Sequence, residues 1–128
     1  MKRLLERSRS LIECAIHEVP FTNYSDGVGD ALCCNLYFAI ELLIIWKLQE
    51  KGVVLDEIPN ITVLAEKLVQ LGYNIYSINN VKETILKIAN WKDEARYGVG
   101  VDITEQEVAG IQKVYWDMFF YLTSTNRR

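Results

Sequence analysis

One long apolar stretch constrains this chain more than any other feature of its sequence. It extends from Leu36 to Leu48 and is interrupted only by Glu41 and Lys47. A helix that spans a membrane needs about 20 apolar residues, so this stretch is too short to cross a bilayer. A helix with apolar residues around its whole circumference is either the central helix of a bundle or one that also faces a partner subunit. We therefore predict that this stretch forms the central helix of a bundle or a helix that also faces a partner subunit, and that it does not associate with a membrane.

Apolar residues at helical spacing predict four further helices around this one. Pro20, Gly52 and Gly72 mark ends of the helices, since proline and glycine commonly follow the last helical residue. No segment alternates in the manner of a β-strand, and no linker or repeat divides the chain. We predict an all-α fold, an up-and-down bundle of four to five helices, as a single domain over residues 1–128. The expected helices are Lys2–Val19, Gly27–Lys51, Asn60–Leu71, Asn80–Arg96 and Thr104–Ser124.

Capping signals support the starts of three of these helices. Asn60 follows Pro59 and can accept hydrogen bonds from the first backbone amides of the third helix. Asn80 with Glu83, and Thr104 with Glu107, have the spacing of a capping box.

Charge and cysteine content restrict the possible partners and the compartment. The chain has 14 Lys and Arg against 17 Asp and Glu, so nucleic-acid binding would need a local basic patch. The basic residues near the two ends are interpreted as solvated helix ends. The first residues lack the apolar core of a signal peptide, and Cys14, Cys33 and Cys34 are interpreted as reduced core thiols. We expect a cytoplasmic protein with no metal site and no cofactor.

Few side chains in the sequence suggest catalysis or ligand binding. His17, the single histidine, is interpreted as a packed or surface residue. Glu41 interests us more, because an unpaired buried charge costs several kcal/mol. It either lies exposed on the bundle surface or lies at a cleft or subunit interface, where Arg96 is its natural partner through two hydrogen bonds. Six aromatic residues resemble a base-stacking set, but we interpret them as core: Trp91, Tyr97, Tyr115, Trp116, Phe119 and Phe120.

Three consecutive segments resemble the HEPN domain family. Residues 36–52 resemble its second helix, with an aromatic-Ala-x-Glu core, an apolar run, a lysine and a closing glycine. Residues 60–71 resemble the short helix that follows, although Asn60 stands where the family often has histidine. Residues 91–98, with the Ala-Arg-Tyr step, resemble the end of the next long helix. The order and lengths match over nearly the whole chain.

The resemblance implies a helical bundle that is commonly a homodimer. Many members are metal-independent RNA endonucleases of toxin–antitoxin, CRISPR-linked and phage-defence systems, and others are partners of small nucleotidyltransferases. The nucleases carry Arg-x(4–6)-His near the start of the last helix. Arg96 occupies the arginine position here, but no histidine follows, and Asp102 is a poor proton-transfer group at neutral pH. Lys47 also lies six residues after Glu41, where four is more usual.

The leading hypothesis is a non-catalytic HEPN-like domain that acts by binding. Its ligand would be a nucleotide, RNA or a nucleotidyltransferase-type protein, and its candidate polar groups are Glu41, Arg96, Tyr97 and Asp102. The alternatives are a diverged metal-independent ribonuclease and a structural helical adaptor. The adaptor hypothesis predicts an exposed apolar face on the second or the last helix and no polar cleft.

Overall fold

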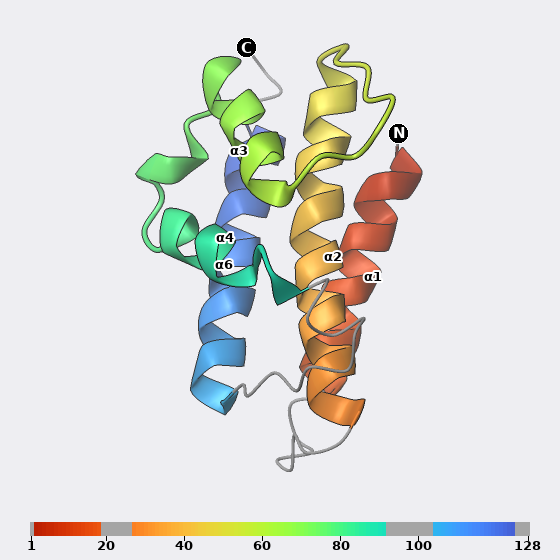
Figure 1. Cartoon of the computed structure of the whole chain (residues 1–128), viewed down its shortest axis with the longest axis vertical. Coiled ribbons are helices and arrows are strands. Elements are labelled where there is room, and N and C mark those ends of the chain that lie inside the picture. The colour runs from red at the N-terminus through yellow and green to blue at the C-terminus, as the bar shows by residue number, and fades with distance from the viewer. Residues whose placement is uncertain (1, 19–26, 92–103, 125–128) are drawn as a thin grey trace.

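The computed structural model describes residues 2–18, 27–91 and 104–124 (Figure 1). These ranges contain no β-strand and five α-helices, so the predicted all-α bundle is confirmed. None of the described helices is long and apolar enough to cross a membrane. The helices are α1 (Lys2–Glu18), α2 (Gly27–Glu50), α3 (Ile61–Gln70), α4 (Val81–Ile88) and α6 (Glu105–Ser124), with a short 3-10 helix, η1 (Ile75–Ser77), before α4.

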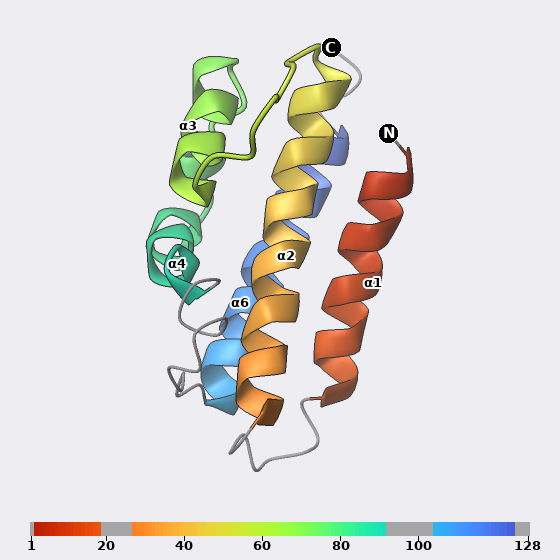
Figure 2. The ribbon, with the colours of Figure 1, turned by 45° about the vertical axis from the view of Figure 1, so that its right-hand side comes forward.

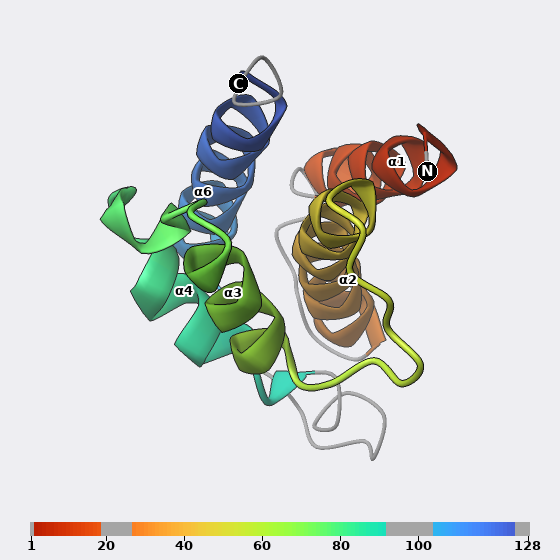
Figure 3. The same ribbon diagram turned by 90° about the horizontal axis from the view of Figure 1, so that it is seen from above.

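The three long helices run side by side, and two short ones cover one flank. Helices α1 and α2 are antiparallel neighbours, and α6 runs in the same direction as α2 (Figures 1 and 2). Seen from above, α1 and α6 border one side of the molecule, while α3 and α4 lie on another (Figure 3). Helix α2 contacts α1, α3 and α6, so it is a central helix, which is one of the two placements that its sequence predicts.

The core is built around α2. Every side chain from Leu43 to Leu48 is buried, which accounts for the absence of a polar stripe on this helix. Ser8 of α1 is also fully buried in this core. The buried apolar side chains of α4 and α6 face this same core: Val81, Ile85, Ile88, Val108, Ile111, Val114, Tyr115, Met118 and Leu122.

Lys47 is buried within this apolar run rather than exposed. Its ammonium donates a hydrogen bond to Glu50 Oε1 at 3.0 Å, one turn further along α2. The same ammonium lies 4.9 Å from the ring centroid of Tyr73 and 5.4 Å from that of Trp46. A carboxylate and two aromatic faces therefore replace part of the hydration that the charge loses on burial.

The predicted caps have mixed outcomes. Asn60 Oδ1 accepts from Thr62 N at 2.9 Å, and Glu107 N donates to Thr104 Oγ1 at 3.1 Å, so both of these caps are confirmed. The capping box at Asn80 is wrong, because Asn80 has φ 68° and its side chain makes no capping hydrogen bond. The left-handed backbone at this position turns the chain into α4 without help from the side chain.

Helix α4 is also shorter than predicted. It ends at Ile88 and is followed by a turn at Ala89 and Asn90, whereas the apolar spacing predicts one helix as far as Arg96; residues 92–96 of that prediction lie outside the described residues. The two predicted glycine ends are confirmed by left-handed backbone, with φ 85° at Gly52 and φ 100° at Gly72. The side chains of Cys14 and His17 lie outside the described part of the chain, as does the backbone at Pro20.

Candidate functional site

Glu41 is the one predicted site residue that the structure describes. Arg96, Tyr97 and Asp102 lie in residues 92–103, outside the described ranges. The Glu41 side chain is only 5% exposed, so its alternative placement on the bundle surface is wrong. The physical reason is that α2 is covered by neighbouring helices on several sides, which leaves little of its circumference in contact with solvent.

Glu41 lines a hollow of about 300 Å³ between α1 and α2. Helix α2 contributes Phe38, Glu41 and Leu42, which share one face because they are three and four residues apart. Helix α1 contributes Arg7 and Leu11, four residues apart and likewise on one face. The hollow therefore has an apolar wall, a buried carboxylate and an exposed guanidinium.

This arrangement suits a flat ligand with polar edges. The ring of Phe38 offers a stacking surface, and a carboxylate accepts hydrogen bonds from N–H groups. The exposed Arg7 guanidinium can donate two parallel hydrogen bonds to a phosphate or a carboxylate. The sequence reasoning missed Arg7, which was grouped with the solvated helix ends. Arg7 lies four residues before Leu11, so the two side chains share one face of α1, and this spacing could have identified Arg7.

Next to the hollow, the buried face of α1 holds a polar network that joins it to α2 and α6. Ser8 Oγ donates to the carbonyl oxygen of Ala39 at 2.5 Å and lies 2.8 Å from Tyr115 Oη. Since the Ser8 proton is used on Ala39, the Tyr115 hydroxyl donates to Ser8. Burial is the main cause that raises the pKa of Tyr115 from its ordinary 10.0 to about 12. The network ties α1, α2 and α6 together.

Beyond Tyr115, α6 presents three aromatic rings in mutual contact, which we call the α6 aromatic face: Trp116, Phe119 and Phe120. Their ring centroids are 5.3 to 6.1 Å apart, and Phe120 is 62% exposed. The Arg9 guanidinium lies 5.8 Å from the centroid of Phe119. The interpretation of the aromatic residues as core is correct for Tyr115 and Trp91, but wrong for Phe120 and only partly correct for Trp116 and Phe119.

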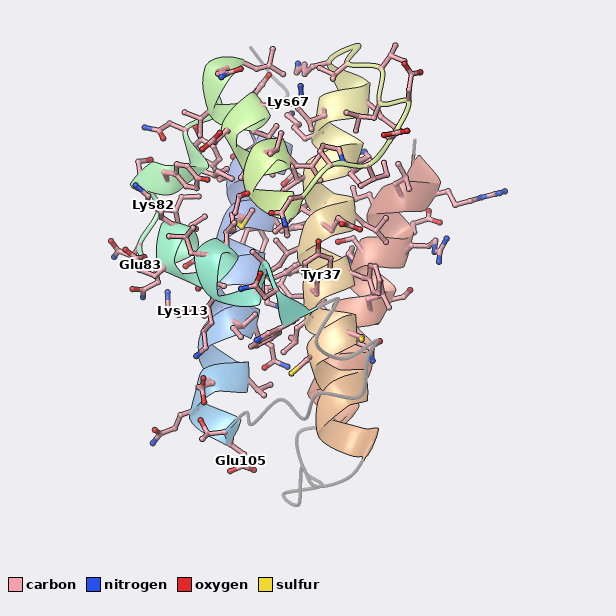
Figure 4. The ribbon with its side chains drawn as sticks, viewed as in Figure 1. Tyr37, Lys67, Lys82, Glu83, Glu105 and Lys113 are labelled. Carbon is pink, nitrogen blue, oxygen red and sulfur yellow. The ribbon has the colours of Figure 1, made fainter. Side chains whose placement is uncertain are left out.

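A second hollow, of about 260 Å³, lies between α4 and α6. Lys87 donates a hydrogen bond to Glu107 on its wall, and this bond is the first cause that lowers the pKa of Glu107. Lys87 and Glu107, two of the charged residues that line this hollow, therefore pair with each other. Figure 4 shows Glu83, which also lines it, and Lys82 projecting outward from α4.

Within the described residues, no group of three or more His, Cys, Asp or Glu side chains could hold a metal ion. No family model matches this chain, and no match to it is found among curated proteins or solved structures.

Proposed function

We propose that this chain is a non-catalytic, HEPN-like helical domain that acts by binding, in the cytoplasm of a prokaryote and within a toxin–antitoxin or defence system. It would work as a homodimer and bind a nucleotide or RNA, or a nucleotidyltransferase-type protein. The observation that carries the proposal is the hollow between α1 and α2, where the buried Glu41 and the exposed Arg7 flank an apolar wall.

The chemistry of the hollow favours a nucleotide among these ligands. A nucleobase would stack on Phe38 while Glu41 accepts hydrogen bonds from its amino or imino N–H groups. A phosphate would then lie at the mouth of the hollow, in reach of Arg7. A volume of about 300 Å³ is at the lower end of the range for small-molecule sites and suits one base with its sugar.

Isothermal titration calorimetry with guanosine and adenosine monophosphates, and with a short single-stranded RNA, tests this function. We expect Arg7→Ala and Glu41→Gln each to weaken binding about tenfold, since each removes a hydrogen bond that involves a charged group. Arg9→Ala is the matched control, because Arg9 lies on the same helix but faces α6 rather than the hollow. Equal affinities of all three variants would contradict the proposal.

The exposed α6 aromatic face favours a second candidate function, the structural helical adaptor. This hypothesis predicts an exposed apolar face on the second or the last helix and no polar cleft, and Phe120 on the last helix is 62% exposed. The adaptor would bind neither nucleotide nor RNA, so the same titrations distinguish it. The RNA samples also test the ribonuclease alternative, since cleavage without added metal would show catalysis.

A further inference from the structure

We propose that the second hollow, between α4 and α6, is a binding site for a small organic ammonium ion, that is, a protonated amine with a short apolar chain. We call it the α4–α6 hollow. It shares no lining residue with the hollow beside Glu41, so this site goes beyond the function proposed above and does not depend on it.

Polar side chains of the two helices meet across the α4–α6 hollow. Glu83 and Lys87 are four residues apart, and Thr84 lies between them, so all three share one face of α4. Glu107 borders the hollow from α6, and the buried Ile111, one turn further along α6, adds an apolar contact surface. A volume of about 260 Å³ with these walls suits a small molecule that has one charged end and one apolar end.

Thr84 is the residue that points to a ligand. It is only 9% exposed, and its hydroxyl forms no hydrogen bond with another described residue. Two hydroxyls of α6 differ from it, because Thr123 and Ser124 each donate to the backbone carbonyl four residues earlier, at 2.8 and 2.6 Å. Most buried polar groups have a partner, and Thr84 borders the hollow, so its hydroxyl is available to a molecule bound there.

The charge of the α4–α6 hollow favours a cation. Glu83 and Lys87 have the spacing at which helical residues commonly pair, but Lys87 donates its hydrogen bond to Glu107 on α6 instead. Glu83 therefore forms no ion pair with another residue of the described ranges. Two carboxylates and one ammonium line the hollow, so a single further positive charge would balance it.

The neighbouring lysines on the two helices are engaged elsewhere. Lys82 projects outward from α4, and its ammonium lies 5.8 Å from the ring centroid of Tyr76 (Figure 4). Lys113 of α6 donates a hydrogen bond to Asp117 at 3.1 Å. The balancing charge is thus left to a bound molecule.

A primary ammonium group matches the acceptors in the hollow better than a metal ion does. It has three N–H donors, and the two carboxylates of Glu83 and Glu107 and the hydroxyl of Thr84 can accept one hydrogen bond each. Ca²⁺ and Mg²⁺ need about six oxygen ligands, which is more than these side chains supply. The alkyl chain of the amine would lie on Ile111.

Gly110 leaves room for such a molecule. It lies within α6, where glycine weakens a helix relative to alanine. A Cβ atom added at this position would meet no atom within 4 Å, so the packing of the chain itself does not require a glycine. Because Gly110 lines the hollow, its bare backbone enlarges the space that is open to a ligand.

An NMR titration of the ¹⁵N-labelled full chain with n-butylamine hydrochloride at low salt tests the proposal. We expect the backbone amides of Glu83, Thr84 and Gly110 to shift along one saturable curve, with a dissociation constant of about 1 mM. Glu83→Gln should weaken binding about tenfold, and Thr84→Val about fivefold, since each removes a hydrogen-bond acceptor of the ammonium. The matched control is Glu105→Gln, because Glu105 is an exposed residue of α6 that does not line the hollow.

A variant that fills the space and three further ligands sharpen the test. Gly110→Leu should abolish the saturable shifts while circular dichroism shows unchanged helix content. 1-Butanol, which lacks the charge, should give no saturable shift, and the zwitterion L-norvaline and calcium chloride should bind more weakly than the amine.

Three results would overturn the proposal. They are a wild-type chain without saturable shifts, equal binding by Glu83→Gln and Glu105→Gln, and binding of 1-butanol, L-norvaline or calcium chloride as tight as that of the amine. The nucleotide titrations with Arg7→Ala and Glu41→Gln concern the other hollow, so a failure of either proposal is distinguishable from a failure of the other.

Discussion

The two sides of α1 carry different chemistry although their residues alternate along one short segment. Towards α2, Arg7 and Leu11 border an open hollow with a buried carboxylate. Between α2 and α6, Ser8 closes a buried hydrogen-bond network, and on the α6 side Arg9 lies over an aromatic ring. Arg7 and Arg9 are two residues apart, and about 100° of rotation per residue places them on opposite sides of the helix.

The packing around a residue, rather than its type, therefore decides whether it borders an open hollow or joins helices through buried hydrogen bonds. Between α1, α2 and α6, each side-chain hydroxyl of the Ser8–Tyr115 network has a partner on a neighbouring helix, so the space is filled. On the hollow side a volume of about 300 Å³ stays open beside Glu41. Four predictions test this contrast.

The largest expected effect is on stability, at Tyr115. Tyr115→Ala should lower the free energy of unfolding by about 3–5 kcal/mol, because it removes a fully buried ring and leaves a cavity. Leu11→Ala, on the half-buried wall of the hollow, should cost only about 1–2 kcal/mol, since solvent can enter the space. Urea denaturation measures both. Equal losses would show that the two sides are equally well packed.

Ser8→Ala should have the next largest effect. It removes the hydroxyl that joins Ala39 and Tyr115, so the Tyr115 hydroxyl is left buried without its acceptor. We expect a loss of about 1–3 kcal/mol in the same denaturation experiment. Ser10→Ala is the control, because Ser10 is an exposed residue of the same helix. A Ser8→Ala variant as stable as the control would contradict a structural role for the network.

A pH dependence of stability should follow from Tyr115. Its pKa is about 12 in the folded chain and about 10 when unfolded, so the folded state holds the proton more tightly. The stability that this provides is fully present below pH 10 and is lost as the pH rises from 10 towards 12. Comparison with Tyr115→Phe isolates the contribution, since that variant lacks the phenol. If the free energy of unfolding changed with pH in the same way for both proteins between pH 10 and 12, the contribution of Tyr115 would be refuted.

The smallest expected effects are those of Arg7→Ala and Arg9→Ala on stability. Both side chains are exposed, and neither forms an ion pair with a described residue, so each change should stay within about 0.5 kcal/mol. The two variants should differ only in ligand binding. A large loss of stability in one of them would show that its guanidinium is structural.

Local sequence patterns determined most of the helical architecture. Apolar spacing identified α1, α2, α3 and α6 to within one or two residues, because the hydrophobic period is a local property. The caps at Asn60 and Thr104 followed from side-chain chemistry and short spacing. The apolar circumference of α2, interrupted only by Glu41 and Lys47, likewise limited this helix to the centre of a bundle or to a position that also faces a partner subunit.

Only the tertiary structure decided which polar residues lie inside and which aromatic rings lie outside. Lys47 is buried because Tyr73, which is 26 residues away, covers its ammonium, and Glu41 is buried beside a hollow because α1 supplies the opposite wall. Phe120 is exposed because the core of α6 is already filled by its other face. These outcomes depend on contacts between distant segments, and the spacing within one segment carries no information about them.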